Sequence, residues 1–325
     1  MRLANSAPLM RELYGPDIRV VVQEKENIVY KMENAGGEGM ITRYQVFPGI
    51  ELLYNDFHMG ECEQNKLPCR DMMEINHCWE GRFECEFPNG SCTYLGQGDL
   101  AVNMLTNRTT ASFFPLAHYH GISVVIDLAG ASETIDRLAA VLGNLPIDLY
   151  AIRDKLCGKG ACCVMRAQES VQHIFSELYT APDELRQGYF KLKVLELLLF
   201  LTRAESPRQG EERRYFYKNQ VAVIKAMKEY MTEHLDRHFT LKELSVGFNI
   251  PLTSMKECFK GVYGTSIYAY MQSCRMEAAA LMLRQTGDSV TVIAEKVGYA
   301  NSSKFSEAFK KQMMMTPSEY RNKRV

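Results

Sequence analysis

The sequence predicts an α+β protein, in which a β-rich N-terminal region is followed by helices and then by an all-α C-terminal domain. Short apolar or alternating runs separated by turn residues fill residues 41–128, a pattern typical of a sandwich or small barrel such as a jelly roll. A helical period of apolar residues begins at residue 132 and continues, with interruptions, to the C-terminus. The 325 residues suffice for two or three domains, each with its own hydrophobic core.

The predicted strands follow a lead-in over residues 1–40, which reads as loose apart from one short strand at Asp17–Gln23 and a flexible Gly-Gly-Glu-Gly turn at 36–39. Asn89-Gly90 favours a tight hairpin turn, because both central residues of such a turn need positive φ. A second turn is expected at Gly96–Asp99. The strand-like runs are Tyr44–Phe47, Ile50–Tyr54, Met72–Cys78, Gly81–Phe87, Cys92–Leu95, Leu100–Met104 and Ile122–Leu128.

Helices are predicted at Ser132–Leu142, Glu169–Tyr179 and Tyr189–Thr202. The third is apolar almost all round, so it should be buried in a bundle or in a dimer interface. Ser206–Arg214 is polar and contains Pro and Gly, as expected for a linker. The predicted organisation is a β domain over 1–130, a helical connector over 131–205, a linker over 206–216 and a C-terminal domain over 217–325.

Composition and charge exclude some classes of protein and favour others. No apolar run approaches the ~20 residues of a membrane span, and the N-terminus lacks a signal-peptide pattern, so a cytoplasmic location without membrane contact is expected. Ten cysteines in such a chain are expected to be thiols rather than disulfides. Residues 215–325 carry 16 Lys and Arg against 10 Asp and Glu, whereas residues 1–214 carry 22 against 29. The basic C-terminal part therefore suits a polyanionic partner.

Two helix-turn-helix units are predicted in the C-terminal region. The first consists of Leu241–Gly247 and Thr253–Val262, and the second of Val290–Val297 and Ser302–Gln312. Thr240 begins a capping box with Glu243. Gly298 supplies positive φ at the second turn. The expected core positions are Leu244, Ile250, Met255 and Phe259, then Ile293, Ala294, Tyr299, Phe305 and Phe309.

These residues resemble the signature of the AraC/XylS family of bacterial transcription regulators. The second unit supplies Ile293-Ala294, Gly298-Tyr299, Phe305, Phe309-Lys310-Lys311, Thr316-Pro317 and Tyr320-Arg321. The first supplies Thr240-Leu241, Ser254-Met255, Phe259-Lys260, Gly264, Tyr270, Arg275, Ala278 and Leu281-Met282. Three positions depart from the family pattern: Glu257 stands where Arg is usual, Ser245 where Ala is usual, and Met314 where a helix-ending Gly is usual.

The resemblance implies two recognition helices that enter successive major grooves of a double-stranded DNA operator, about 34 Å apart. It implies base contacts from Thr253, Ser254, Lys256 and Glu257 in the first helix and from Ser302, Ser303, Lys304 and Glu307 in the second. Lys260, Lys310, Lys311 and Arg321 are then expected to hold phosphates or the domain itself, and Arg275 to be structural and to pair with an acidic group. RNA polymerase is a candidate partner.

By the same resemblance, the N-terminal region is a cupin-like barrel that binds a small-molecule effector, and adjoining helices pair two chains into a homodimer. Candidate ligand contacts are aromatic residues of the strand region, namely Tyr54, Trp79, Phe83, Tyr94 and Phe113. No cofactor is expected, and no Walker loop, dinucleotide fingerprint or nucleophile elbow points to an enzyme.

Two further clusters could carry chemistry in this region. His118 and His120 have the His-x-His spacing of metal-binding cupins, but no Glu follows closely, so ordinary strand histidines are expected and no metal. Cys157, Cys162 and Cys163 form a glycine-flanked cluster near Lys159, which would expose and activate a thiolate for redox chemistry.

Three hypotheses of function remain open at this level. The first is an effector-controlled, sequence-specific DNA-binding regulator. The second is a regulator whose N-terminal half is only a dimer scaffold, controlled by protein level or thiol redox. The third is a metal-cupin or thiol-transfer enzyme that carries a DNA-binding domain.

Overall fold

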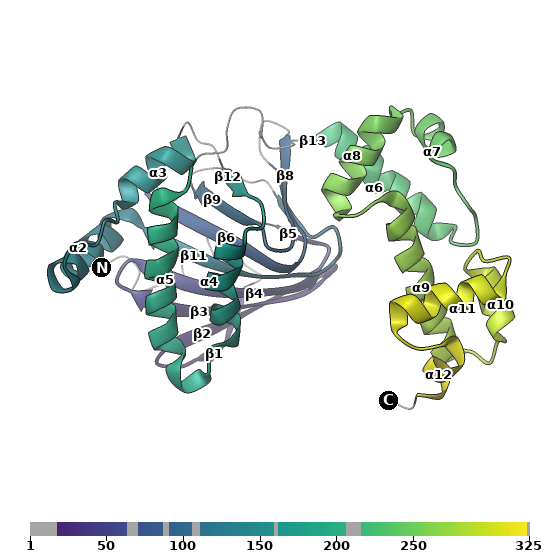
Figure 1. Ribbon diagram of the computed structural model, residues 1–325, viewed down its shortest axis with the longest axis horizontal. Helices are drawn as coiled ribbons and strands as arrows, with labels where there is room; N and C mark the ends of the chain where they lie inside the picture. Colours follow the sequence, from purple (N-terminus) through teal and green to yellow (C-terminus); the bar gives the residue numbers. More distant parts are fainter. Residues whose placement is uncertain are drawn as a thin grey trace. The chain divides into compact units, whose positions relative to one another are not determined.

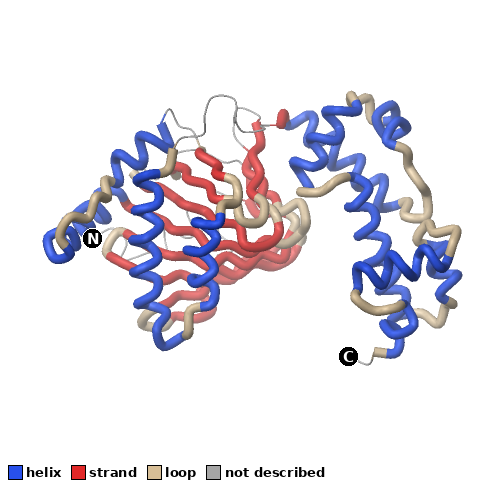
Figure 2. Tube along the Cα trace, viewed as in Figure 1, coloured by secondary structure: helices blue, strands red, loops and turns tan. Residues whose placement is uncertain are grey.

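The protein is described by a computed structural model covering residues 18–63, 71–86, 91–105, 111–158, 162–205 and 216–323 (Figure 1). The chain forms two compact units, residues 1–215 and 216–325. The boundary coincides with the end of the predicted linker, of which only Phe216 belongs to the described residues. The predicted α+β class is confirmed, since the first unit is built on sheets and the second on helices (Figure 2).

The first unit contains an eight-stranded sheet in which all neighbouring strands are antiparallel. Its centre is the strand β11, which pairs with β4 on one side and β6 on the other. In spatial order the strands are β1 (Arg19–Gln23), β2 (Asn27–Asn34), β3 (Gly37–Phe47), β4 (Ile50–Met59), β11 (Tyr119–Asp127), β6 (Met72–Gly81), β9 (Leu100–Met104) and β12 (Cys163–Met165).

A smaller sheet in the first unit contains the predicted hairpin. The strands β7 (Phe83–Glu86) and β8 (Ser91–Leu95) are antiparallel, with Phe83 opposite Leu95 and Glu86 opposite Cys92. The turn that joins them lies outside the described residues. β10 (Ala111–Phe113) pairs with β7 and with β5 (Glu61–Glu63). The turn at Gly96–Asp99 is also confirmed, because the Asp99 amide donates to the Gly96 carbonyl at 3.0 Å.

The two faces of the large sheet are buried against different partners. Leu52 and Val124 point into a core that contains Phe175 and Phe190 from helices, whereas Leu53 and Val125 point into a second core on the opposite face. Figure 1 shows helices crossing one face of this sheet. The helical segments of the unit are α2 (Leu128–Leu142), α3 (Leu149–Cys157), α4 (Glu169–Thr180), the 3₁₀ turn η3 (Asp183–Leu185) and α5 (Arg186–Arg203).

The loose lead-in predicted for residues 1–40 is wrong beyond β1. Residues 27–34 form β2, and of the glycine-rich segment only Gly36 lies in the turn at 35–36, whereas Gly37–Gly39 open β3. Gly37 has φ 140°, and a Cβ there would lie 2.0 Å from the His58 carbonyl oxygen, while a Cβ on Gly39 would meet the Phe57 ring at 2.3 Å. Glycine at these positions therefore marks close packing within a strand, which composition alone does not distinguish from a loop.

The second unit consists of helices, described from Phe216 to Lys323. Helix breaks fall where they were predicted, and α7 has the predicted bounds. After the short extended segment β13 (Phe216–Tyr217), the helices are α6 (Lys218–Glu233), α7 (Leu241–Gly247), α8 (Leu252–Tyr263), α9 (Ile267–Gln285), α10 (Val290–Lys296), α11 (Ser302–Met313) and α12 (Pro317–Asn322). Within the described residues, no helix combines the length and apolar character needed to cross a bilayer.

His77 is a histidine in the core of the first unit. It lies on β6, is 1% exposed and stacks on Phe175 of α4, with ring centroids 4.0 Å apart and planes 5° apart. Neither ring nitrogen has a hydrogen-bond partner in the structure. Burial penalises the charged imidazolium and lowers the pKa of His77 to about 4.

We expect His77 to make the first unit acid-sensitive. The unfolded chain takes up this proton near pH 6.5 and the folded chain only near pH 4, so stability falls as the pH drops between those values. The difference between pH 7 and pH 5 should be about 2 kcal/mol. Urea unfolding followed by the fluorescence of Trp79, the sole tryptophan, measures it.

His77→Leu should remove that part of the pH dependence, whatever its effect on stability at pH 7. The matched variant His173→Leu, in which an exposed imidazole is replaced, should retain it. An unchanged pH slope in His77→Leu would show that the buried imidazole does not titrate with the fold.

Candidate nucleic-acid interface

Two helix-turn-helix units, α7–α8 and α10–α11, are joined by the long helix α9. The residues predicted to form their cores do so: Met255, Phe259, Phe305 and Phe309 are fully buried, and Leu244, Ile250, Ile293 and Ala294 nearly so. Tyr299 is half-buried and packs edge-on against Phe305, with ring centroids 5.7 Å apart.

Local hydrogen bonds fix where each short helix begins. Thr240 and Glu243 form the predicted capping box at α7. Ser289 caps α10, and Asn301 caps α11 by accepting from the Ser303 and Lys304 amides at 2.9 and 3.1 Å. The first turn of α11 is therefore held in place by its cap, with the Ser303 and Lys304 side chains directed outward.

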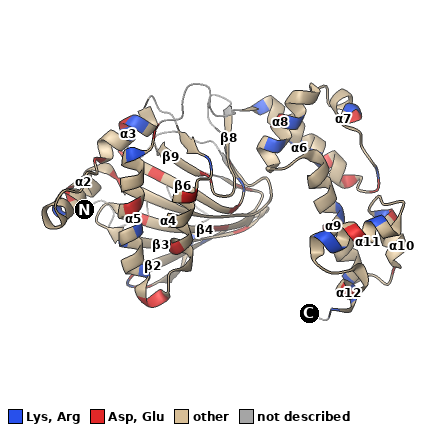
Figure 3. Ribbon diagram, viewed as in Figure 1, with Lys and Arg blue, Asp and Glu red and all other residues tan. Residues whose placement is uncertain are grey.

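The residues predicted to contact DNA lie on the outer faces of α8 and α11. On each helix, buried residues such as Met255 and Phe309 face the core, and the polar residues between them form one stripe on the opposite side. The positions of Lys and Arg are coloured blue on both helices in Figure 3. The exposed residues are Thr253, Lys256, Glu257 and Lys260 on α8 and Ser303, Lys304, Glu307, Lys310 and Lys311 on α11, whereas Ser254 and Ser302 are half-buried.

The junction between the two helix-turn-helix units is a chain of hydrogen bonds centred on Arg275 of α9. Its guanidinium is nearly buried and donates to the carbonyls of Leu235 and Arg237 at 2.9 and 2.8 Å and toward His238 Nδ1 at 3.4 Å. The Nε2 atom of His238 lies 2.5 Å from the Gly298 carbonyl oxygen. The structural role expected for Arg275 is confirmed, but its partners are backbone carbonyls and an imidazole rather than an acidic side chain.

Gly298 is required at this junction for two reasons. Its φ is 84°, and a Cβ would lie 2.8 Å from the Leu235 carbonyl oxygen and 3.0 Å from that of Asp236. The turn of the second unit therefore rests directly on the segment that follows α6. Arg321 likewise holds the domain together, because it donates to the Asp288 carbonyl at 2.5 Å.

A sequence profile described as "Helix-turn-helix domain" matches residues 244–323, which span both units and the connecting helix. The C-terminal unit is an AraC-type helix-turn-helix domain. The match covers this unit and leaves the first unit outside it.

Two transcriptional activators align with the AraC-type domain at moderate sequence identity. The chain is 28% identical over 129 residues to the HTH-type transcriptional activator RhaR of Mannheimia succiniciproducens, covering 40% of this chain and 45% of that protein. It is 36% identical over 102 residues to the RCS-specific HTH-type transcriptional activator RclR of Escherichia coli, covering 31% and 34%. The aligned part thus spans less than half the length of either relative.

Among solved structures, the C-terminal domain of AraT, a response regulator from Geobacillus stearothermophilus, is 31% identical. It covers 32% of this chain and 86% of that chain, with a TM-score of 0.31.

The five aromatic residues predicted to contact a ligand pack in different parts of the first unit. Tyr54 lies in the helix-covered core, where its hydroxyl donates to the Leu178 carbonyl. Phe83 packs in the opposite core. Trp79 packs on Tyr179 of α4, with ring centroids 4.5 Å apart. Tyr94 is buried and Phe113 is half-buried. Of the five, Trp79 alone lines a pocket on the α4 side, described below.

The two histidines of the His-x-His motif have different neighbours. His120 contacts Tyr179, with ring centroids 5.4 Å apart, whereas His118 lies beside His58, with centroids 5.0 Å apart. His58 Nε2 is 3.1 Å from Asp56 Oδ1, so Asp56, His58 and His118 bring three potential ligand atoms within 4.8 Å of one another. Sequence spacing did not identify this cluster, because His58 and Asp56 come from β4. That no metal binds here stays a prediction.

The exposed thiolate predicted for the cysteine cluster is wrong. Cys157, Cys162 and Cys163 are all buried, the first at the end of α3 and the last in β12, which pairs with β9. Flanking glycines suggested exposure, but the apolar core of the unit takes up these small side chains. Cys62, Cys78 and Cys92 are buried strand residues, whereas Cys69 and the side chain of Cys85 lie outside the description.

The two recognition helices end differently. Gly264 ends α8 with φ 79°, and Met314 occupies the equivalent left-handed position after α11, with φ 60°. A side chain in this conformation costs about 1–2 kcal/mol, whereas glycine does not pay that cost. Met314 is 84% exposed, so little packing offsets it.

Met314→Gly should therefore raise the stability of the AraC-type domain by about 0.5–1 kcal/mol, and the matched variant Gly264→Ala should lower it by about 1 kcal/mol. Thermal unfolding followed by far-ultraviolet circular dichroism measures both changes. A loss of stability in Met314→Gly would contradict the left-handed end of α11.

Proposed function

We propose that the protein is a sequence-specific DNA-binding transcription regulator, whose helices α8 and α11 enter successive major grooves on one face of the duplex. The proposal is supported chiefly by one domain that contains two helix-turn-helix units with exposed polar helices, connected through the Arg275–His238–Gly298 junction. Two helices joined in this way can read a longer site than either could alone. The relatives RhaR and RclR are both named as transcriptional activators.

The side chains divide between base reading and phosphate binding according to their place on the helix. Residues at the start of a recognition helix reach base edges, so Ser303 and Lys304 are assigned to bases. Lys310 and Lys311 lie in the last turn of α11 and are assigned to phosphates. Glu257 can accept from a cytosine amino group, which would give α8 a base preference different from that of family members with arginine there.

Selection of duplexes from a random pool by the full chain, followed by anisotropy titration, tests the DNA-binding proposal. Lys304→Ala should weaken binding to the selected duplex about tenfold and relax preference at one position. Lys310→Ala should weaken binding to all duplexes alike and reduce the slope of affinity against salt by about one.

The control for these variants is Lys191→Ala, which removes an exposed lysine from α5 of the first unit and should leave affinity unchanged. If the wild-type chain enriches no sequence from the pool, the proposed function fails.

We further propose that the chain acts as a homodimer through α5. Its inner face is fully buried by Phe190, Val194, Leu197, Leu198 and Leu201. Leu192 and Leu199 on α5 and Leu185, which directly precedes the helix, are seven residues apart and are 67%, 36% and 57% exposed. A seven-residue spacing of leucines is the pattern with which two helices pack side by side.

Native mass spectrometry of the full chain tests the dimer. The wild-type spectrum should contain two chains, and Leu192→Glu should convert it to one chain because a carboxylate would be buried in the seam. Leu281→Glu, which changes a leucine on α9 that is 54% exposed, should leave the dimer intact. A monomeric wild-type protein would contradict the role of this stripe.

Control by a small-molecule effector is the remaining part of the proposal. A pocket of about 570 Å³ lies between β6 and α4 in the first unit, a volume within the range of ligand sites. The indole ring of Trp79 lines this pocket together with mostly polar residues. The lining residues are His77, Trp79, Gln97, Gly98, Glu169, Gln172, His173 and Ser176. An adduct of a few hundred daltons in the native spectrum of host-purified protein supports this site if Trp79→Ala abolishes the adduct. The burial of the Cys157 cluster disfavours the redox-controlled alternative.

A further inference from the structure

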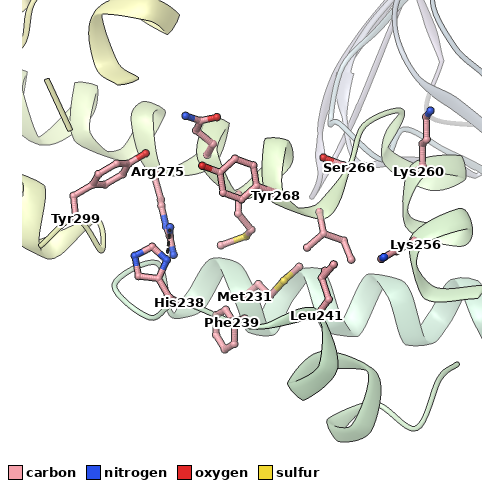
Figure 4. A pocket seen from close by; sticks show the side chains of 13 residues that line it. Met231, His238, Phe239, Leu241, Lys256, Lys260, Ser266, Tyr268, Arg275 and Tyr299 are labelled. Carbon is pink, nitrogen blue, oxygen red and sulfur yellow. Dashed lines mark hydrogen bonds between the residues drawn. The ribbon is translucent and has the colours of Figure 1, made fainter. Parts of the chain in front are cut away.

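A second pocket, of about 410 Å³, lies inside the AraC-type domain (Figure 4). It is bounded by α6, the segment leading into α7, the recognition helix α8, the first half of α9 and the turn after α10. Figure 4 shows Lys256 and Lys260 at one end and His238, Arg275 and Tyr299 at the other. The pocket therefore reaches from a recognition helix to the junction of the two units.

The inner surface of the pocket is apolar and aromatic. Met231, Ile267 and Met271 are buried side chains that face it from α6 and α9. Phe239 and Tyr268 add aromatic surface. An apolar ligand that enters the pocket loses its contact with water. Each Å² of apolar surface buried in this way stabilises the complex by roughly 25 cal/mol.

The charges in the pocket are all positive. Lys256, Lys260 and Arg275 contribute to the lining, and no Asp or Glu does. The carbonyls of Leu235 and Arg237 already hold the Arg275 guanidinium. Neither Lys256 nor Lys260 has an ion-pair partner among the described residues, and their spacing of four places both on one side of α8. One end of the pocket is thus lined by two lysines. In Figure 4 the amino group of Lys256 points into the pocket, whereas that of Lys260 points away from Lys256 and reaches a shared anion only after rotation of its side chain.

We propose that this pocket binds a small organic anion with an aromatic or other apolar body, its acidic group held by Lys256 and Lys260, and that this ligand weakens DNA binding. The inhibitory part rests on the proposed function, because it requires α8 to contact DNA. A DNA phosphate competes for the same ammonium groups but has no apolar body to fill the pocket. Ligand and DNA therefore compete, and each must lower the affinity of the other by the same factor.

Methyl signals of the lining methionines test binding at this place. The full chain is labelled at its methionine methyl groups, and Met231→Leu and Met271→Leu assign the two signals. The probe is 4-phenylbutyrate, with 4-phenylbutan-1-ol as its uncharged counterpart. Phenylbutyrate should shift both signals saturably, with the alcohol at least tenfold weaker. The absence of saturable shifts at both signals would overturn the site.

Charge variants test the role of the two lysines. Lys256→Gln with Lys260→Gln should weaken phenylbutyrate binding about tenfold and leave the alcohol unchanged. The matched control, Lys310→Gln with Lys311→Gln, removes two cations from α11 outside the pocket and should leave phenylbutyrate binding intact. Equal weakening by both pairs would mean that general positive charge, rather than this pocket, holds the anion.

Competition with DNA tests the inhibitory part. Saturating phenylbutyrate should lower the affinity of the protein for the selected duplex. The duplex should lower the affinity of the protein for phenylbutyrate by the same factor. Methyl shifts without any change in DNA affinity would retain the site and overturn the inhibition. If the chain selects no DNA sequence but its methyl signals still shift with phenylbutyrate, the proposed function fails and the ligand site is supported.

Discussion

The Arg275 guanidinium is the group on which the geometry of the AraC-type domain depends. It projects from the connecting helix and binds the segment after α6, and through His238 it reaches the turn of the second helix-turn-helix unit. With Arg275 donating toward Nδ1 of His238, the Nε2 atom carries the proton and donates to the Gly298 carbonyl. This chain of bonds connects α9, the segment after α6 and the turn that precedes α11.

Such a buried cation is stable only because its hydrogen bonds replace its hydration. Burial lowers the pKa of the Arg275 guanidinium from its ordinary value, but arginine remains charged in proteins. Each hydrogen bond from a charged group contributes about 1.5–3 kcal/mol. A lysine could not reproduce the arrangement, because the planar guanidinium addresses several acceptors at fixed angles. This requirement explains an arginine without any acidic partner in the middle of α9.

The sequence predicted the second unit in more detail than the first. The capping box at Thr240 and the turn at Gly298 are local signals that tertiary packing did not override. The aromatic residues of the strands and the cysteines of the 157–163 segment carry no such signal, because a strand side chain can face either of two cores. The partners of Arg275 and the pairing of His58 with His118 depend on the fold, and neither has a sequence pattern of its own.

Lys256 and Lys260 connect the two proposals for the AraC-type domain. Both lie on the outer side of a recognition helix and also line the pocket beside α9, so the same charges serve DNA or a small anion, but not both at once. The first unit would act separately, by pairing chains through α5 and by taking up a ligand between β6 and α4.

Hydroxyl-radical footprinting of the full chain on a selected duplex with one half-site tests whether one chain places two recognition helices in adjacent major grooves. We expect two protected patches on one face of the duplex, about one helical turn of 10–10.5 base pairs apart. A single protected patch, or two patches on opposite faces, would contradict it.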